Sequence, residues 1–234
     1  MIIKYLRKVC EMNNGSLKEY SEIFEEEYLK QISKRIRAYL TMDGYMGLEK
    51  DYTPAEFKAI EDEVILDFKH SNRKKFNLHE VVTLKMQLKN TPELLIRIFE
   101  FNSNTYYRKN KSQFDTSIDL NGLEPSFSIS ETDLFKNVPK NKIITHEFTF
   151  EELKGKIGIF IIEIQGGNKV CRAVIKKGSL TMIHKPTAAG HQAYIIDADN
   201  KICNSDNGTT GLYIGDTFYQ SDKIKNGSIF IPFK

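Results

Sequence analysis

Two histidines and one cysteine are the residues of this chain whose types suggest a metal site. His184 and His191 lie seven positions apart, and Cys203 follows them. Imidazole nitrogens and thiolates are common zinc ligands, so the three could hold a catalytic metal. However, neither spacing is that of a recognised ligand pair, and the two histidines fall in different predicted local structure. The sequence favours ordinary loop or strand positions, and an enzyme with a His/Cys metal site stays as an alternative.

The other polar motifs do not complete a catalytic constellation. Gly166 and Gly167 lack the lysine and the following helix of a phosphate-binding loop. No serine lies in a G-x-S-x-G turn. His146 alternates with apolar residues, which favours a packing role, because no partnered nucleophile is visible. The sequence therefore predicts a chain that is not an enzyme and binds neither a metal nor another cofactor.

A short aromatic and basic run is the candidate binding surface. Tyr106, Tyr107, Arg108 and Lys109 follow one another in a polar stretch, residues 101–114, that we expect to be a loop. Tyrosine and arginine are enriched at the hot spots of protein interfaces. Alternatively, the tyrosines fold back over a sheet edge and the cations are solvated. We interpret the run as a candidate protein-interaction site.

Composition excludes several classes of partner. The chain has 34 basic and 31 acidic residues among 234, a net charge of +3, which gives no electrostatic argument for nucleic acid or an anionic membrane. No apolar run reaches the ~20 residues that a membrane span requires. The three cysteines, Cys10, Cys171 and Cys203, do not form a disulfide framework. The compartment stays open.

Residues 1–75 are predicted to form a helical hairpin. Ser16 and Glu19 match a capping box, and apolar residues then recur every three or four positions as far as Leu40. Thr53-Pro54 signals a second helix start, which apolar residues continue at helical spacing as far as Phe68. The apolar face of the first helix must be buried on the sandwich, on the second helix or on another chain. We expect the chain's own body to cover it, because the second helix offers a partner face within reach of a short loop.

Residues 76–178 are predicted to form an antiparallel β-sandwich, organised around a hairpin. Ile157–Ile164 is almost wholly apolar and returns through a glycine-rich turn as Val170–Ile175, with Ile143–Phe150 as a neighbouring strand. Ile161 and Ile162 lie on opposite faces of this hairpin, and we expect both to be buried.

Further strands precede that hairpin. Val82–Leu88 alternates cleanly, and Asn90-Thr-Pro92 should turn it back onto its partner Leu94–Phe101. Thr116–Leu120 is predicted to be a short strand, whereas Glu124–Asn141 has no clear period. The number of strands is that of a small sandwich.

Residues 179–234 are predicted to form a second small β unit, either complete or incomplete. Its elements are a strand at Ala193–Ile196, a hairpin over Leu212–Tyr219 and a strand at Ser228–Phe233. The motifs Leu212-Tyr-Ile-Gly215 and Ser221-Asp222, followed by an Asn-Gly turn, resemble the repeat of macroglobulin-type and related immunoglobulin-like modules over about residues 81–234. The resemblance implies an array of sandwiches that act through protein contacts. The macroglobulin thioester motif is absent.

These observations predict an α+β chain in three parts: a helical hairpin (1–75), an antiparallel immunoglobulin- or macroglobulin-like sandwich (76–178) and a small β unit (179–234). The predicted function is a non-catalytic structural or protein-interaction module, a fragment of a larger multi-domain macroglobulin-like protein. A carbohydrate-binding module is a further alternative. It would need an aromatic platform, for which the candidates, without any tryptophan, are Tyr106, Tyr107, Tyr213 and Tyr219.

Overall fold

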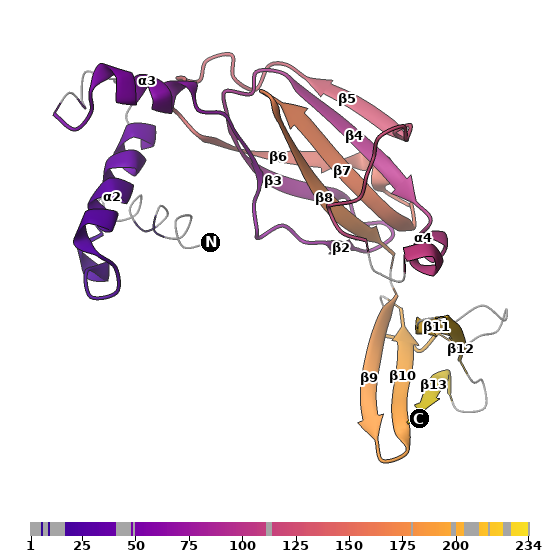
Figure 1. Ribbon diagram of the computed structural model, residues 1–234. Helices are drawn as coiled ribbons and strands as arrows, with labels where there is room; N and C mark the ends of the chain where they lie inside the picture. The colour runs from indigo at the N-terminus through magenta and orange to yellow at the C-terminus, as the bar shows by residue number, and fades with distance from the viewer. Residues whose placement is uncertain are drawn as a thin grey trace.

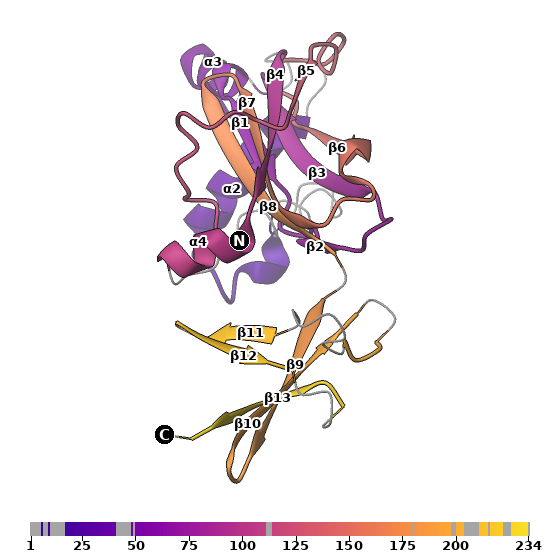
Figure 2. The same ribbon diagram turned by 90° about the vertical axis from the view of Figure 1, so that its right-hand side faces the viewer.

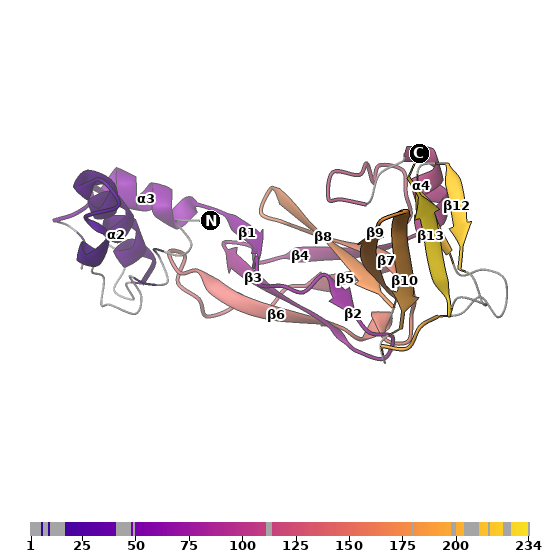
Figure 3. The same cartoon turned by 90° about the horizontal axis from the view of Figure 1, so that it is seen from below.

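The computed structural model describes residues 6, 9, 17–40, 48, 50–110, 114–178, 180–197, 200–203, 211–214, 216–221 and 226–233. Three parts follow one another along the molecule, with helices at one end, a two-sheet sandwich in the middle and a smaller β unit at the other end (Figure 3). The predicted α+β class is confirmed. Ser16, Gly215 and Asp222, which carried part of the sequence argument, lie outside the described residues.

The first helical stretch is shorter than predicted. A 3-10 turn, η1 (Lys18–Tyr20), comes first, and the helix α2 runs only over Glu26–Leu40. Between them the Tyr20 carbonyl accepts hydrogen bonds from the Ile23 and Phe24 amides. This turn folds Leu17, Tyr20 and Phe24 back onto α2. The apolar residues therefore keep helical spacing in the sequence, although the helix itself is interrupted between Tyr20 and Glu26. The apolar face of α2 is covered in this way, in a cluster of Leu6, Val9, Leu17, Tyr20, Phe24, Leu29, Ile32 and Ile36.

The second helix, α3 (Pro54–Asp62), starts where the sequence predicts. Thr53 Oγ1 accepts from the Glu56 amide at 3.3 Å, while Glu56 Oε2 accepts from the Thr53 amide at 2.8 Å, which completes a capping box. Phe57 packs with Ala38 near the end of α2, so the predicted contact between the helices is made at that end only. The extension of this helix to Phe68 is wrong, because residues 65–68 form strand β1.

The sandwich consists of two sheets (Figures 1 and 2). The three-stranded sheet has the order β1-β3-β6 and the five-stranded sheet the order β2-β8-β7-β4-β5. Their bounds are β1 Ile65–Phe68, β2 Lys75–Phe76, β3 Val82–Lys89, β4 Leu94–Phe101, β5 Phe127–Glu131, β6 Ile144–Phe150, β7 Gly158–Gly166 and β8 Lys169–Lys177. In immunoglobulin lettering, β1-β3-β6 correspond to A-B-E and β8-β7-β4 to G-F-C, which is the arrangement of that fold.

Two predicted strand pairings are wrong. Asn90, at a φ of 52°, turns the chain between β3 and β4, but the two strands enter opposite sheets instead of pairing. β6 pairs with β3, and the neighbour of β7 is β4, with Ile96 opposite Ile164. The central hairpin of β7 and β8 is confirmed. Alternation within a strand shows which side chains share a face, but not which sheet the strand joins, because both inner faces border one core.

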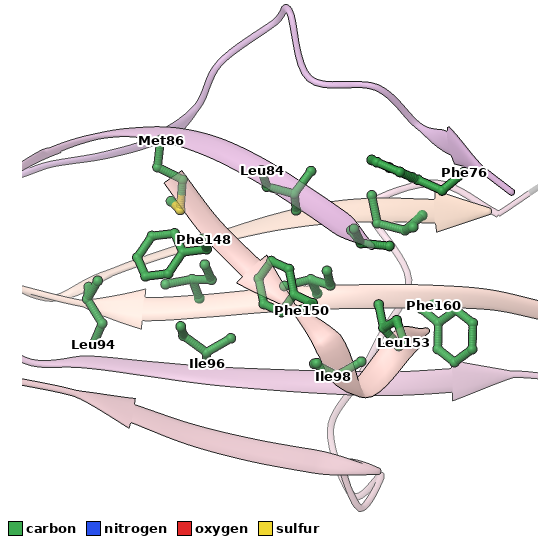
Figure 4. Close-up of a cluster of buried hydrophobic side chains, with 14 of the residues drawn as sticks. Phe76, Leu84, Met86, Leu94, Ile96, Ile98, Phe148, Phe150, Leu153 and Phe160 are labelled. Carbon is green, nitrogen blue, oxygen red and sulfur yellow. The ribbon is translucent and has the colours of Figure 1, made fainter. Parts of the chain in front are cut away.

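The main core lies between the sheets, with side chains from β3 and β6 meeting those of β4 and β7 (Figure 4). Ile162 is fully buried there, and Ile161 is fully buried in a second cluster on the outer face of the five-stranded sheet. Both expectations for this pair are confirmed. The outer cluster is covered by helix α4 (Ser103–Asn110) and by residues 114–120.

Three local predictions in this region are wrong. Residues 103–110 are a helix and not a loop, and the Asn102 side chain accepts a hydrogen bond from the Thr105 amide at 3.0 Å to start it. Residues 116–120 are not a strand. β5 lies inside the stretch without a clear period and pairs with the edge of β4. A short 3-10 turn, η3 (Glu151–Leu153), follows β6.

The C-terminal unit has a three-stranded sheet of order β13-β10-β9 and a separate β11-β12 hairpin. Their bounds are β9 Thr181–Thr187, β10 Gly190–Ile196, β11 Gly211–Ile214, β12 Thr217–Gln220 and β13 Ser228–Pro232. β9 was not predicted, because all its side chains except Thr187 are exposed and it shows no burial pattern. Ala193, Ile195 and Ile229 are the buried members of a small core.

Candidate functional site

Helix α4 carries the aromatic and basic run. Tyr106 stacks on Phe114, with ring centroids 3.9 Å apart and planes 23° from parallel. Both rings belong to the outer cluster that covers Phe99 and Ile161. Tyr106 therefore fixes α4 to the sheet. For this tyrosine the alternative interpretation holds, in which the ring folds back over the sheet.

The same helix also contacts the C-terminal unit. The Arg108 guanidinium donates a hydrogen bond to the Tyr213 hydroxyl and lies 4.9 Å from the centre of the Tyr213 ring. Tyr107 is half-buried, and Lys109 is exposed. Figure 1 shows α4 at the end of the sandwich that faces β11. The run thus lies at the junction between two parts of the chain, which its sequence position did not indicate.

Three of the four tyrosines considered for a carbohydrate platform, Tyr106, Tyr213 and Tyr219, pack against other parts of the chain. Tyr106 stacks on Phe114. The Tyr213 ring contacts both Arg108 and Phe218, with 4.7 Å between the ring centroids of Tyr213 and Phe218. Tyr219 packs against the core of the C-terminal unit. These contacts give no support to a shared sugar-binding face.

The structure brings His184 and His191 together. They lie on the neighbouring strands β9 and β10, and His184 Nε2 is 2.8 Å from His191 Nδ1. The expectation that the histidines occupy different local structure is therefore wrong. Cys203 packs instead against the small core, where burial raises the pKa of its thiol, helped by the charge of Asp197. In the described part of the chain no three His, Cys, Asp or Glu side chains are grouped to hold a metal ion.

A cavity of about 700 Å³ lies between α2 and the sandwich. Arg35, Tyr39 and Glu63 join its two sides, with 2.8 Å from Arg35 Nε to the Tyr39 hydroxyl and 2.7 Å from Arg35 Nη2 to Glu63 Oε1. Tyr39 also donates to Glu63 Oε2. Burial, together with the Glu63 carboxylate, raises the pKa of Tyr39 to about 12. The same cavity is lined by Ile65 of the edge strand β1 and by Val170.

A second cavity, of about 590 Å³, lies on the outer face of the five-stranded sheet. Its floor contains Arg97 on β4, Glu163 on β7 and Arg172 on β8, which lie directly opposite one another across three adjacent strands. No motif in the sequence marks these three residues as a site. The available signal was a single charge inside each of three apolar runs, residues 94–99, 159–164 and 170–175.

No helix in the described residues is both long and apolar enough to cross a membrane.

Comparison with known proteins supports the sandwich. Residues 94–178 match the family model of the AbpF first immunoglobulin-like domain, so the resemblance to immunoglobulin-like modules is confirmed there. That match starts at β4, whereas the sandwich in the structure already includes β1 to β3.

One curated relative matches almost the whole chain. It is Actin-binding protein F of Dictyostelium discoideum, 31% identical over 99% of this chain and 10% of the relative. The chain therefore spans about a tenth of the relative's length.

Solved structures similar to the chain include segments of native alpha-2-macroglobulin from Escherichia coli. One spans domains NIE-MG1, with 11% identity, a TM-score of 0.49, and coverage of 74% of this chain and 89% of that one. The other spans MG0-NIE-MG1, with 11% identity, a TM-score of 0.47, and coverage of 74% and 58%.

Proposed function

We propose that this chain is a non-catalytic interaction module of a larger protein built from immunoglobulin- and macroglobulin-like modules, and that its partner is actin. The observation that carries the proposal is the alignment with a protein named for actin binding, which extends over 99% of the chain. Such an alignment relates all three parts of the chain to one segment of that relative, including the helices that a single sandwich does not need.

The proposed contact surface is the exposed side of α4, with Tyr106, Tyr107, Arg108 and Lys109 in different roles. Tyr106 holds α4 on the sheet through Phe114. Arg108 sets the position of α4 against β11 through Tyr213. Tyr107 and Lys109 are then the residues that meet the partner, an aromatic side chain and a cation of the kind that protein interfaces use.

We also propose that the module divides into a helical part up to residue 64, a sandwich over 65–177 and a C-terminal unit from 180. The sequence placed the first boundary after residue 75. Strand β1 pairs with β3 from Ile65 to Phe68, and Leu66 belongs to the main core. The earlier boundary keeps this strand with its sheet.

Co-sedimentation with filamentous actin tests the function. We expect saturable co-sedimentation of the whole chain, and about a tenfold weaker affinity for the double variant Tyr107→Ala, Lys109→Glu. Lys185→Glu, an exposed charge reversal on β9, is the control and should bind like the unaltered chain. Absence of binding by the unaltered chain would reject actin as the partner. Equal binding by the double variant would reject α4 as the surface.

A further inference from the structure

The row of Arg97, Glu163 and Arg172 on the outer face of the five-stranded sheet contains one more positive than negative charge. Glu163 is 2% exposed, and both of its carboxylate oxygens are used: Oε1 accepts from Arg97 Nη2 and Oε2 from Arg172 Nε at 2.7 Å. No other charged residue lines this cavity among the described residues. Both arginine side chains are partly withdrawn from solvent, and a partly desolvated cation without a matching anion is unfavourable. The second guanidinium is therefore the unusual feature of this cavity.

The two guanidinium groups still have donors available. Arg97 Nε is buried and has no hydrogen-bond partner in the described part of the chain. Arg172 Nη1 donates a hydrogen bond of 2.8 Å to the Ile118 carbonyl. This bond fixes the guanidinium plane of Arg172 against residues 114–120, which cover the sheet. Each guanidinium has five N–H donors, and the identified bonds use only part of them.

The cavity is also accessible. The side chains of Arg97 and Arg172 are 34% and 26% exposed, although Glu163 beneath them is closed off. Leu123 and Val170 on its rim are about half exposed, at 47% and 52%. A fixed pair of guanidinium groups bordered by exposed apolar side chains suits an anionic group with apolar neighbours.

We propose that this cavity binds an anionic side chain of a peptide, a carboxylate or a phosphate, between Arg97 and Arg172. Glu163 serves as the positioning residue that orients both guanidinium groups. The anion balances the surplus charge, and the apolar neighbours in the peptide contact Leu123 and Val170. This site is separate from the Tyr107 and Lys109 surface and does not depend on actin being the partner.

Isothermal titration of the whole chain tests the site with three short peptides: acetyl-Leu-Glu-Leu-amide, its phosphoserine analogue and the neutral glutamine analogue. We expect the anionic peptides to bind at least tenfold more tightly than the neutral one, because only they accept charge-assisted hydrogen bonds. The two anionic peptides distinguish a carboxylate from a phosphate ligand. Inorganic phosphate alone should bind more weakly than the phosphopeptide, because it lacks the apolar contacts.

Variants locate the binding. Arg97→Gln should weaken the anionic peptides at least tenfold, and Arg97→Lys should restore less than half of that loss in free energy, because an ammonium lacks the planar fork. Arg35→Gln removes an arginine that also pairs with a glutamate, but at the other cavity, and should leave binding unchanged. Equal binding of the anionic and neutral peptides, or unaltered binding by Arg97→Gln, would overturn the proposal.

A measurement on the unaltered chain covers the case in which Arg97→Gln fails to fold. The Nε–H signals of Arg97 and Arg172 in an NMR spectrum should shift saturably with the better anionic peptide, while that of Arg35 stays in place. If sodium chloride at the same ionic strength shifts them equally, the row is a structural element of the sheet and no ligand site.

Discussion

The sandwich is connected to its two neighbours in contrasting ways. Towards the helices, the Lys89 ammonium donates hydrogen bonds to the carbonyls of Ile60, Glu61 and Glu63. The distance from Lys89 Nζ is 2.9 Å to the Glu61 oxygen and 2.8 Å to the Glu63 oxygen. Asn141 adds a buried bond of 2.8 Å to the Ala38 carbonyl. Towards the C-terminal unit, β8 and β9 are joined by residues 178–180, where Gly178 has a φ of 129°, and Arg108 contacts Tyr213 at the surface.

The contrast shows what makes a junction between modules rigid. Lys89 is fully buried, so its bonds cannot be exchanged for bonds to water, and they also cap the last carbonyls of α3. Arg108 and Tyr213 form an exposed pair, whose hydrogen bond and ring contact compete with solvent. We therefore expect the helices to move with the sandwich and the C-terminal unit to change its orientation more easily.

The largest expected effect concerns the sandwich on which both junctions depend. Ile162→Asp places an unpaired carboxylate in the main core, at a cost of several kcal/mol against a total stability of roughly 5–15 kcal/mol. We expect no soluble folded protein, judged by yield and circular dichroism. Ile183→Asp on β9, where the side chain is 49% exposed, is the control and should fold. A normally folded Ile162→Asp variant would show that the sandwich is not the common support.

The next effect tests the rigid junction. Lys89→Met keeps most of the side-chain volume but removes three charge-assisted hydrogen bonds to the end of α3. Among the described residues, the Glu61 and Glu63 carbonyls then keep only the Asn90 side-chain amide as donor, and the Ile60 carbonyl keeps the Glu63 amide. We expect a loss of about 2–4 kcal/mol in the free energy of unfolding by urea. Faster amide exchange in α3 than in β7 would locate the damage at the junction. Unchanged stability and exchange would mean that Lys89 does not join the helices to the sandwich.

A smaller effect is expected from pH at the same junction. The pKa of Tyr39 is raised to about 12 in the folded protein, above the ~10 of an unfolded tyrosine. Tyr39 thus keeps its proton to a higher pH in the folded state than in the unfolded state. The stability that this difference contributes is fully present below pH 10 and is lost as the pH rises towards 12. We expect a loss of roughly 1–2 kcal/mol between these pH values.

The matched variant for this pH effect is Tyr39→Phe, which should flatten that part of the stability curve. Tyr52→Phe serves for comparison, because the pKa of Tyr52 is also raised to about 12, mainly by burial. If Tyr39→Phe retained the full pH dependence, the Arg35–Tyr39–Glu63 network would not be its source.

The smallest effect concerns the exposed junction. Tyr213→Phe removes the hydroxyl that accepts from Arg108 but keeps the ring, and should change the free energy of unfolding by less than about 1 kcal/mol. Small-angle scattering should nevertheless show a broader range of shapes for Arg108→Gln, which loses both contacts. A destabilisation as large as that of Lys89→Met would remove the contrast between the two junctions.

Part of the candidate site was predictable from the sequence and part was not. Tyrosine and arginine side by side marked α4 as a binding candidate, because residue type alone suggests interface chemistry. The partners of these side chains, Phe114 for Tyr106 and Tyr213 for Arg108, could not be found this way. The second partner lies 105 positions away, and no local pattern encodes its proximity.

The sequence by itself determined the elements with strong local signals. Thr53, Pro54 and Glu56 specify the start of α3 through neighbouring atoms, and the apolar run around Ile161 and Ile162 specifies a strand covered on both faces. Only the tertiary structure decided which sheet each strand joined, and it placed Arg97, Glu163 and Arg172 in one row. Strand pairing between distant segments depends on the shared burial of many side chains, so alternation in β3 and β4 is compatible with one sheet or with two.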